Sequence, residues 1–310
     1  MEFFVSFLAT VVLTPIVIRV SGSMGLVDQP SNDILKIHKQ PTPRSGGIPL
    51  AAGLIAALLV VRPSAALLVA AFAALTIGLI DDLLTLSAGF RLAAETLLAL
   101  GTSILALGAG SWPLVLFGTA MILVAINAAN LFDGMDGLLS GAGLISAAGL
   151  AILSTGASAG WLWALAGALA GFLVHNRPPA RIFLGDGGAY VVGATLGVSA
   201  VQLLEDPPRA LGGMLAFGLI GLDLILTVIR RVRDRQSLFI GDRSHIYDQL
   251  TRRGFSVWRT LAILWTLQTL LVAAGLLVAP LTLTLALAAS VVLLLLSLLA
   301  AQKMGFIRTG

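Results

Sequence analysis

The feature that most constrains this chain is a succession of apolar runs, each long enough to cross a lipid bilayer as a helix. A membrane-spanning helix needs about 20 mainly apolar residues. Only 11% of the 310 residues are charged, whereas soluble domains carry roughly 25%. We therefore expect an all-α fold, a polytopic transmembrane helical bundle that forms a single domain over residues 1–310. The expected spans are 3–20, 47–62, 64–80, 92–109, 112–130, 138–155, 160–175, 187–204, 209–229, 257–278 and 280–302.

The sequence predicts about eleven spans, with ten as the alternative. The run 47–62 is short, and the last two runs meet at Ala279-Pro280, where the chain must reverse tightly. The first run lacks the positive flank and the small-residue cleavage site of a signal peptide, so we interpret it as a membrane helix.

The basic residues indicate how the bundle is oriented. If the spans alternate from an outside N-terminus, 17 of the 19 lysines and arginines fall on one face, and only Arg62 and Arg209 fall on the other. Because basic residues accumulate on the cytoplasmic side of membrane proteins, we assign the first face to the cytoplasm. The isoelectric point near 10.1 then reflects orientation and not a nucleic-acid partner. The largest cytoplasmic loop is expected at residues 230–256.

The same alternation brings nearly all acidic motifs to the cytoplasmic face. Any single aspartate there could be a hydrated loop residue, since carboxylates that reach water avoid the cost of burial in lipid. As a set, acids framed by glycine and asparagine beside an arginine-rich loop indicate an anionic substrate with a divalent cation. The chain has no cysteine, which excludes thiolate metal sites. The aspartates are Asp28, Asp81, Asp82, Asp133, Asp136, Asp186, Asp242 and Asp248, with His38, His175 and His245 on the same face.

Two motifs flank the second and third expected spans. The segment 39–47 reads Lys-Gln-Pro-Thr-Pro-Arg-Ser-Gly-Gly, and Lys39 and Arg44 beside a helix N-terminus could cradle a phosphate. The alternative is a turn with interfacial anchors. Asp81 and Asp82 close the third span. Adjacent carboxylates at a membrane boundary repel each other, which favours a cation or a base-like role over a purely structural one.

The stretch 127–138, Asn-Ala-Ala-Asn-Leu-Phe-Asp-Gly-Met-Asp-Gly-Leu, is the most informative in the chain. Asn127 and Asn130 share a helix face if the helix reaches Asn130. Asp133 and Asp136 follow, each directly before a glycine. Together these amides and carboxylates could bind a nucleotide or a metal ion.

Two later loops carry further candidates. Asn176 begins a loop that ends with Phe183 and a Gly-Asp-Gly-Gly turn around Asp186, and this turn is informative only together with the other motifs. In the loop 230–256, the first four arginines are typical of attraction to anionic lipid. Arg243 and His245 lie beyond that run, in a segment of more specific composition.

Ionisable residues also fall inside the expected spans. A carboxylate within the membrane is costly, which makes Asp223 a functional candidate, although we favour a structural hydrogen bond. Arg91 and Glu95 are four residues apart and are expected to pair along one helix, and Arg91 could also face the substrate.

These motifs resemble those of the polyprenyl-phosphate N-acetylhexosamine-1-phosphate transferases. The resemblance extends from Asp28 to about Gly254. It consists of Pro-Thr-Pro-Arg-x-Gly-Gly, the Asp81-Asp82 pair, Asn-x-x-Asn-x-x-Asp-Gly-x-Asp-Gly and Phe-x-Gly-Asp, in that order. It implies an enzyme of the bacterial cytoplasmic membrane that transfers a sugar-1-phosphate from a UDP-sugar to undecaprenyl phosphate. GlcNAc is the expected sugar, another N-acetylhexosamine or the muramoyl-pentapeptide sugar is the alternative, and a homodimer is compatible with the family.

The resemblance also implies roles for individual residues. Mg²⁺, or Mn²⁺ in its place, would bind Asp186 directly, and Asp81 and Asp82 would serve the metal or the attacking lipid phosphate. These three aspartates are the expected catalytic residues. Asn130, Asp133 and Asp136 would bind the nucleotide, and Phe183, with Asn176 in support, would stack on uracil. The other expected substrate-binding residues are Lys39, Arg44, Arg91, Asn127, Arg243 and His245.

The last cytoplasmic loop departs from the family pattern. Members usually carry a histidine pair where this chain has Tyr247 and Asp248, which leaves the donor sugar open. A secondary transporter is the rival interpretation, but transporters bind substrate near the bilayer midplane, whereas the acids here are expected at helix ends. An inactive scaffold is a second rival, and the intact aspartates argue against it.

Overall fold

The computed structural model covers the whole chain, and the structure describes residues 1–23, 27–29, 40–237 and 243–307. Lys39, His38 and Asp242 lie outside the described residues. The elements are α1 (Glu2–Ser21), β1 (Val27–Asp28), β2 (Thr42–Pro43), α2 (Gly47–Ala57), α3 (Ala65–Leu84), α4 (Ala88–Leu107), α5 (Trp112–Phe132), α6 (Leu138–Leu153), α7 (Gly156–Asn176), α8 (Gly185–Gln202), the single turn η1 (Leu203–Glu205), α9 (Pro207–Ala216), α10 (Gly218–Arg233), α11 (Ile246–Arg252), α12 (Val257–Val278) and α13 (Leu283–Lys303).

Helix coincides with every expected span, which confirms the predicted polytopic, all-α membrane fold. Eight of the described helices are long and apolar enough to cross a bilayer, and α9 with α10 adds a ninth if the bent pair counts as one span. At the two remaining positions, α2 and α6 are apolar but shorter, with 11 and 16 residues. The described chain therefore holds eight or nine full-length spans and not eleven.

The centre of the bundle is α8. Its residues are mostly glycine, alanine and valine, and nearly all of them are buried. Small side chains let helix backbones approach closely in lipid, where dispersion contacts hold helices together. Accordingly α3 and α5 pack along α8, and α2, α4, α6 and α7 complete its surroundings. The start of this central helix thus lies inside one end of the bundle.

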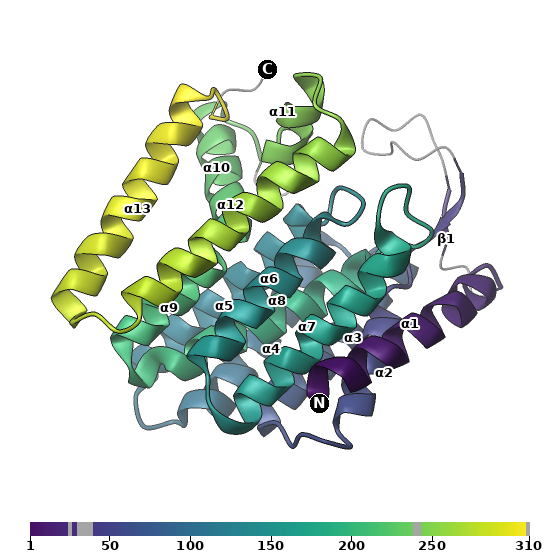
Figure 1. The fold of residues 1–310 in the computed structure, drawn as a ribbon, viewed down its shortest axis with the longest axis horizontal. Coiled ribbons are helices and arrows are strands. Elements are labelled where there is room, and N and C mark those ends of the chain that lie inside the picture. Colours follow the sequence, from purple (N-terminus) through teal and green to yellow (C-terminus); the bar gives the residue numbers. More distant parts are fainter. Residues whose placement is uncertain (24–26, 30–39, 238–242, 308–310) are drawn as a thin grey trace.

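The loops that carry the motifs gather at that end, which we call the motif end. In Figure 1 the N-terminus lies at the bottom, whereas β1, α11 and the C-terminal side of the chain lie toward the top. At the motif end β1 pairs with β2 in antiparallel register, with Val27 opposite Pro43 and Asp28 opposite Thr42. The predicted one-sided placement of the motifs is therefore present in the fold.

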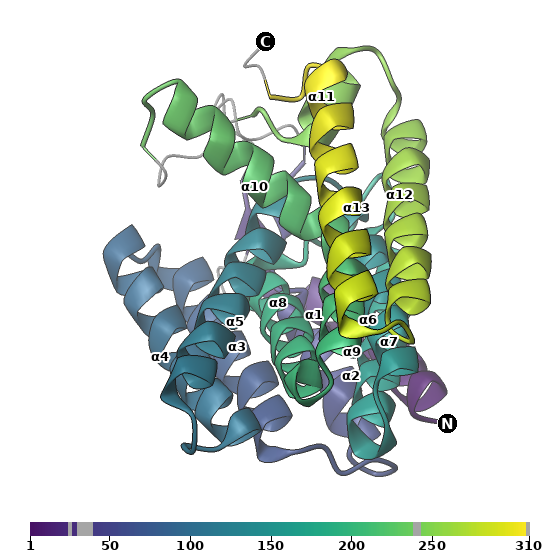
Figure 2. The same cartoon turned by 90° about the vertical axis from the view of Figure 1, so that its left-hand side faces the viewer.

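The expected span 209–229 is not a straight helix. It is divided between α9 and α10, which meet at an angle of 73°, and Figure 2 shows α10 leaning away from the bundle toward the motif end. A break inside a membrane protein leaves backbone groups that need partners. The Gln268 amide of α12 supplies them, because its Nε2 donates to Ala216 O at 2.6 Å and its Oε1 accepts from Leu219 N at 3.1 Å.

The helix α10 also extends further than the sequence predicts. It continues to Arg233, so the first arginines of the predicted loop 230–256 are helical. Arg230 and Arg231 are buried, which makes the expectation of a lipid-facing basic run wrong for these two residues. Further along the same loop, α11 forms a second short helix.

We expect Gln268→Leu to lower the free energy of unfolding by about 2–6 kcal/mol, because it leaves two buried backbone groups unpaired at about 1–3 kcal/mol each. Thermal unfolding in detergent measures the change. Thr269→Val, on the exposed side of the same helix, is the matched control and should stay close to wild type. Equal losses of stability in the two variants would contradict the role of Gln268 as the hydrogen-bond partner of the backbone groups at the break.

Candidate active site

Backbone hydrogen bonds join the first motif loop to the Phe-x-Gly-Asp motif. Phe183 N donates to Pro43 O at 2.7 Å, and Gly46 N and Gly47 N donate to Phe183 O and Leu184 O at 3.0 Å each. These bonds hold two segments that are about 140 residues apart in the sequence side by side. They form one wall of the site at the start of α8.

Gly185 sets the geometry at the start of α8. Its φ of +72° lies in the left-handed region, which strains residues with a Cβ. A Cβ at this position would also overlap the carbonyl oxygen of Arg44. Glycine here therefore lets the chain turn sharply and brings Asp186 into the first turn of α8. A helix N-terminus stabilises negative charge, both on Asp186 and on an anionic ligand.

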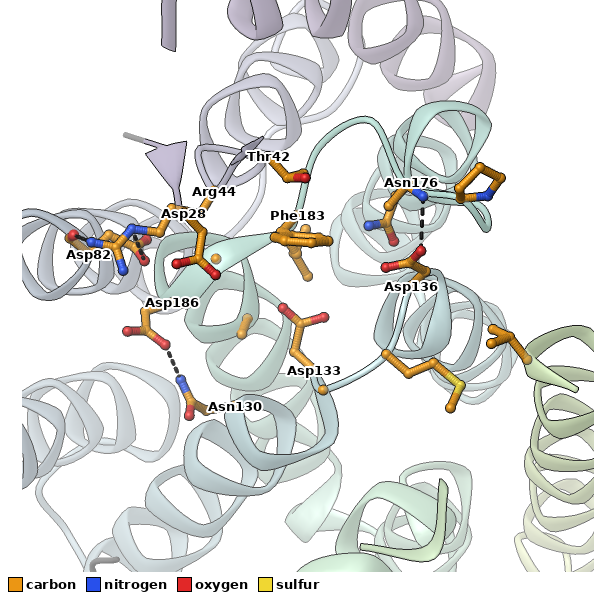
Figure 3. A pocket seen from close by; sticks show the side chains of 18 of the residues that line it. Asp28, Thr42, Arg44, Asp82, Asn130, Asp133, Asp136, Asn176, Phe183 and Asp186 are labelled. Carbon is orange, nitrogen blue, oxygen red and sulfur yellow. Dashed lines mark hydrogen bonds and ion pairs between the residues drawn. The ribbon is translucent and has the colours of Figure 1, made fainter. Parts of the chain in front are cut away.

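A cavity of about 710 Å³ opens beside this turn, a size typical of small-molecule sites. Figure 3 shows carboxylates from several segments converging on it. Three of its polar lining residues, Asp28, Gln40 and Thr42, were not among the predicted site residues. The β1–β2 pairing brings Asp28 in, and no sequence spacing reveals that pairing. The predicted residues that line the cavity are Arg44, Asp82, Asn130, Asp133, Asp136, Asn176, Phe183, Asp186 and Arg243.

Asp82 and Asp186 lie together at the base of the cavity. Asp186 Oδ1 accepts a hydrogen bond from Asn130 Nδ2 at 2.6 Å, and Asp82 Oδ2 accepts one from Gly187 N at 3.1 Å. Arg44 donates to the backbone carbonyl of Asp82. Its Nε is buried, makes no hydrogen bond and lies 3.9 Å from Asp82 Oδ1. This guanidinium therefore has hydrogen-bonding capacity left for an anion.

Asp133 differs from its neighbours because its carboxylate makes no hydrogen bond or ion pair with any described residue. In Figure 3 it lies between Phe183 and the Asn130–Asp186 pair. It keeps some contact with solvent, yet burial among protein atoms raises the pKa of Asp133 well above its usual range, and repulsion from Asp186, Asp82 and Asp136 raises it further. A carboxylate in this position favours either a proton or a cation.

Asp136 and Asn176 hold the far side of the cavity together. Asp136 Oδ2 accepts from Ala180 N at 2.9 Å. The Asn176 amide is fully used within the protein: its Oδ1 accepts from Gly137 N at 3.0 Å and from Ser140 Oγ at 2.7 Å, and its Nδ2 donates to Ile182 O at 2.9 Å. These bonds fix the Asp-Gly-x-Asp-Gly turn relative to Phe183.

Asp81, adjacent to Asp82, faces away from the cavity. Its Oδ1 accepts from Leu86 N at 2.9 Å, and its Oδ2 lies 3.2 Å from Tyr190 Oη and 3.4 Å from Arg91 Nη1. Neither Asp81 nor Arg91 lines the cavity. Asp81 therefore joins α3, α4 and α8 behind the site.

Other predicted residues also lie outside the cavity. Asn127 donates to Glu95 Oε2 at 2.6 Å, and the predicted pairing of Arg91 with Glu95 is an electrostatic attraction without a direct ion pair among the described residues. Glu95 faces the interior between α4 and α5, where Asn127 reaches it, while Arg91 at the helix end turns to Asp81. His245 is buried against Asp223, which confirms the structural hydrogen bond favoured for Asp223. Lys39 lies outside the described residues.

The donor atoms around the cavity suit a hard divalent cation. Among the described residues no three His, Cys, Asp or Glu side chains form a ready-made metal site. Mg²⁺ does not require one, since it is usually held by one or two carboxylates with water and substrate phosphates. Asp82, Asp133 and Asp186 repel one another across the site, and a cation would relieve that repulsion. The residues present therefore fit the expected cofactor.

The matches to a family model and to individual known proteins agree with one another. The model of glycosyl transferase family 4 matches residues 64–204. Over 283 residues the chain is 29% identical to a probable undecaprenyl-phosphate N-acetylglucosaminyl 1-phosphate transferase of Bacillus subtilis, covering 82% of the chain and 77% of that protein. It is 31% identical to the decaprenyl-phosphate N-acetylglucosaminephosphotransferase of Mycobacterium tuberculosis, covering 74% and 70%. A phospho-N-acetylmuramoyl-pentapeptide-transferase of Synechococcus is 36% identical over 211 residues, covering 64% and 57%.

The raised pKa of Asp133 predicts how stability depends on pH when no divalent cation is present. A carboxyl group whose pKa is higher in the folded than in the unfolded state stabilises the fold fully below its unfolded pKa. That contribution is lost as the pH rises through the folded value. Asp133→Asn removes this dependence, so its thermal stability relative to wild type should increase with pH. Melting curves in chelator between pH 4 and pH 9 test this, and a constant difference between the proteins would contradict it.

Proposed function

Because this chain belongs to the polyprenyl-phosphate N-acetylglucosamine-1-phosphate transferases of glycosyl transferase family 4, it is a membrane phosphotransferase, and we propose that it transfers GlcNAc-1-phosphate from UDP-GlcNAc to undecaprenyl phosphate. The products are the lipid-diphosphate sugar and UMP. The observation that carries this proposal is the convergence of Asp82, Asp133 and Asp186 with Arg44 on one cavity at the motif end.

The cavity offers separate regions for the nucleotide and for its phosphates. Phe183 presents an aromatic ring on one wall, and a nucleobase can stack on such a ring. Asp133 lies near that ring, where it can accept from the nucleotide. Arg243 lines the same cavity and can neutralise phosphate charge. We therefore assign the uridine to the wall formed by Phe183 and the Asp133 turn.

The reacting phosphates fit best at the start of α8. Phosphoryl transfer requires mainly positioning and neutralisation of charge. The N-terminus of α8 favours anions there, and the positively charged Arg44 lines the cavity beside it. A lipid phosphate is already ionised at neutral pH, so the attacking oxygen needs no strong base. For this reason we assign Asp81, whose oxygens are bound within the protein, to positioning Arg91 and the neighbouring helices.

Mg²⁺ is the cofactor we propose, with Mn²⁺ as a substitute. Asp186 and Asp82 would hold it, with Asp133 near enough to share its charge. When bound, the ion would neutralise negative charge that develops between the two phosphates. Asn130, hydrogen-bonded to Asp186, orients that carboxylate toward the cavity.

The proposal also specifies the membrane in which the protein lies and the donor sugar. The chain is a multi-pass membrane protein, and we place it in the bacterial cytoplasmic membrane with the motif end facing the cytosol, where nucleotide sugars are made. The relatives that align over 283 residues are named for N-acetylglucosamine, which supports GlcNAc over the muramoyl-pentapeptide sugar. A homodimer stays a prediction.

We expect purified protein with Mg²⁺, undecaprenyl phosphate and labelled UDP-GlcNAc to form a lipid-linked product and release UMP. Asp186→Asn should lower kcat by about 100-fold or more, because it removes a charge on which phosphate neutralisation depends. Asp206→Asn, an exposed carboxylate at the opposite end of the bundle, should leave turnover unchanged. No turnover with any UDP-hexosamine or with the muramoyl-pentapeptide donor would refute the proposal.

Phe183→Leu should raise KM for the UDP-sugar by about tenfold, because stacking of a base on an aromatic ring contributes about 1–3 kcal/mol. KM for undecaprenyl phosphate should change by less than about twofold, since the lipid phosphate does not need this ring. Phe117→Leu, on an exposed part of α5, controls for loss of a phenyl ring. Initial-rate kinetics with each substrate varied in turn would show an unchanged donor KM if uracil binds elsewhere.

A further inference from the structure

The segment that follows Ser244 is tied to α10 by an aspartate and a histidine buried inside the protein. Asp223 is 0% exposed and His245 is 3% exposed. His245 Nδ1 lies 2.6 Å from Asp223 Oδ2, and Ile246 N donates to Asp223 Oδ1 at 2.9 Å. Both carboxylate oxygens therefore bind the start of α11, which fixes the orientation of the His245 ring.

The same group of residues is connected to the end of α13. Arg230 Nη2 donates to Thr227 Oγ1 at 2.9 Å, and that oxygen lies 3.4 Å from His245 Nδ1. Arg230 Nη1 donates to Phe306 O at 3.1 Å. The Phe306 carbonyl also accepts from Gln249 Nε2 at 3.1 Å, and the guanidinium of Arg253 lies 4.5 Å from the centre of the Phe306 ring.

On its other side, His245 packs against Tyr247. The two rings are parallel within 2°, with centroids 5.3 Å apart. Tyr247 Oη donates to Leu131 O at 3.2 Å, and its hydroxyl occupies the space that a Cβ on Gly134 would need. Tyr247 therefore touches the turn that presents Asp133 to the cavity, without lining the cavity itself.

We propose that Tyr247 and Asp223 are positioning residues for the donor nucleotide: the bonds from Phe306 through Arg230 and Thr227 to His245 and Asp223 hold Tyr247 against residues 131–134, and so fix the Asp133 carboxylate. This inference rests on the proposed function for its kinetic consequence. Its structural part, the support of the Asp133 turn by Tyr247, does not depend on any substrate.

The geometry also predicts which kinetic constant responds. Asp133 and Gly134 of this turn line the nucleotide side of the cavity, whereas Asp82 and Arg44 come from other segments. Loosening this turn should therefore weaken binding of the donor and leave the lipid phosphate largely unaffected. A residue that only stabilised the fold would lower the amount of active enzyme without separating the two KM values.

The variants are Tyr247→Phe, which removes only the hydroxyl, and Asp223→Asn, which keeps the shape of the side chain. Each should raise donor KM by about 3- to 10-fold, as expected for loss of a single hydrogen bond, with KM for undecaprenyl phosphate within about twofold of wild type. The double variant should be no worse than the more affected single variant, because both act on one turn. Asp234→Asn, beyond the end of α10 and outside these contacts, should behave as wild type.

Hydrogen–deuterium exchange of residues 131–137, in detergent and without substrates, tests this proposal independently of the proposed function. Faster exchange of this segment in Tyr247→Phe, with the rest of the bundle unchanged, supports the positioning role even if wild type turns over none of the donors. Wild-type exchange and wild-type donor KM in Tyr247→Phe would overturn it. If Asp223→Asn does not fold, Tyr247→Phe alone decides the matter, since it leaves the Asp223–His245 pair intact.

Discussion

Carboxylates held close together at the start of a buried helix are the constraint on which the rest of this site depends. Asp186 lies in the first turn of α8, with Asp82 and Asp133 near it. Like charges this close, and shielded from water, require compensation. The protein supplies it from three sources: the positive end of α8, amide donors such as Asn130 Nδ2, and Arg44. The remaining negative charge, and an Asp133 carboxylate with no partner among the described residues, leave a site suited to a cation and a phosphorylated ligand.

The need to satisfy every backbone group in lipid shapes the other half of the molecule. A straight helix over 209–229 would satisfy it without help, but α9 and α10 are broken, and the Gln268 amide replaces the lost bonds. The bend directs α10 away from the bundle toward the motif end. In this position α10 carries Asp223 and Arg230 to α11, so a polar residue of α12 makes possible the contacts that position Tyr247.

Residues of the same type have different roles here because their side chains point in different directions. Asp81 and Asp82 are neighbours in sequence, yet Asp82 lines the cavity while Asp81 binds Tyr190 and Arg91 behind it. Consecutive helical residues point about 100° apart, so an adjacent pair at a helix end cannot face one ligand equally. Asn127 and Asn130 share a face of α5 but lie about one turn apart, so Asn130 reaches Asp186 whereas Asn127 binds Glu95.

The sequence by itself determined the membrane class, the helical positions and the gathering of the motifs at one end, because hydropathy and charge placement are local properties that lipid selects strongly. It also identified most of the polar residues that line the cavity, such as Arg44 and Asp186. Only the tertiary structure decided that Asp28 joins the site, that Asp81 and Asn127 face away, and that α9 and α10 are broken. Those outcomes depend on contacts between residues far apart in the chain, such as Tyr190 with Asp81 and Gln268 with Ala216. Hydrophobic periodicity and motif spacing are local patterns, so they do not predict such contacts.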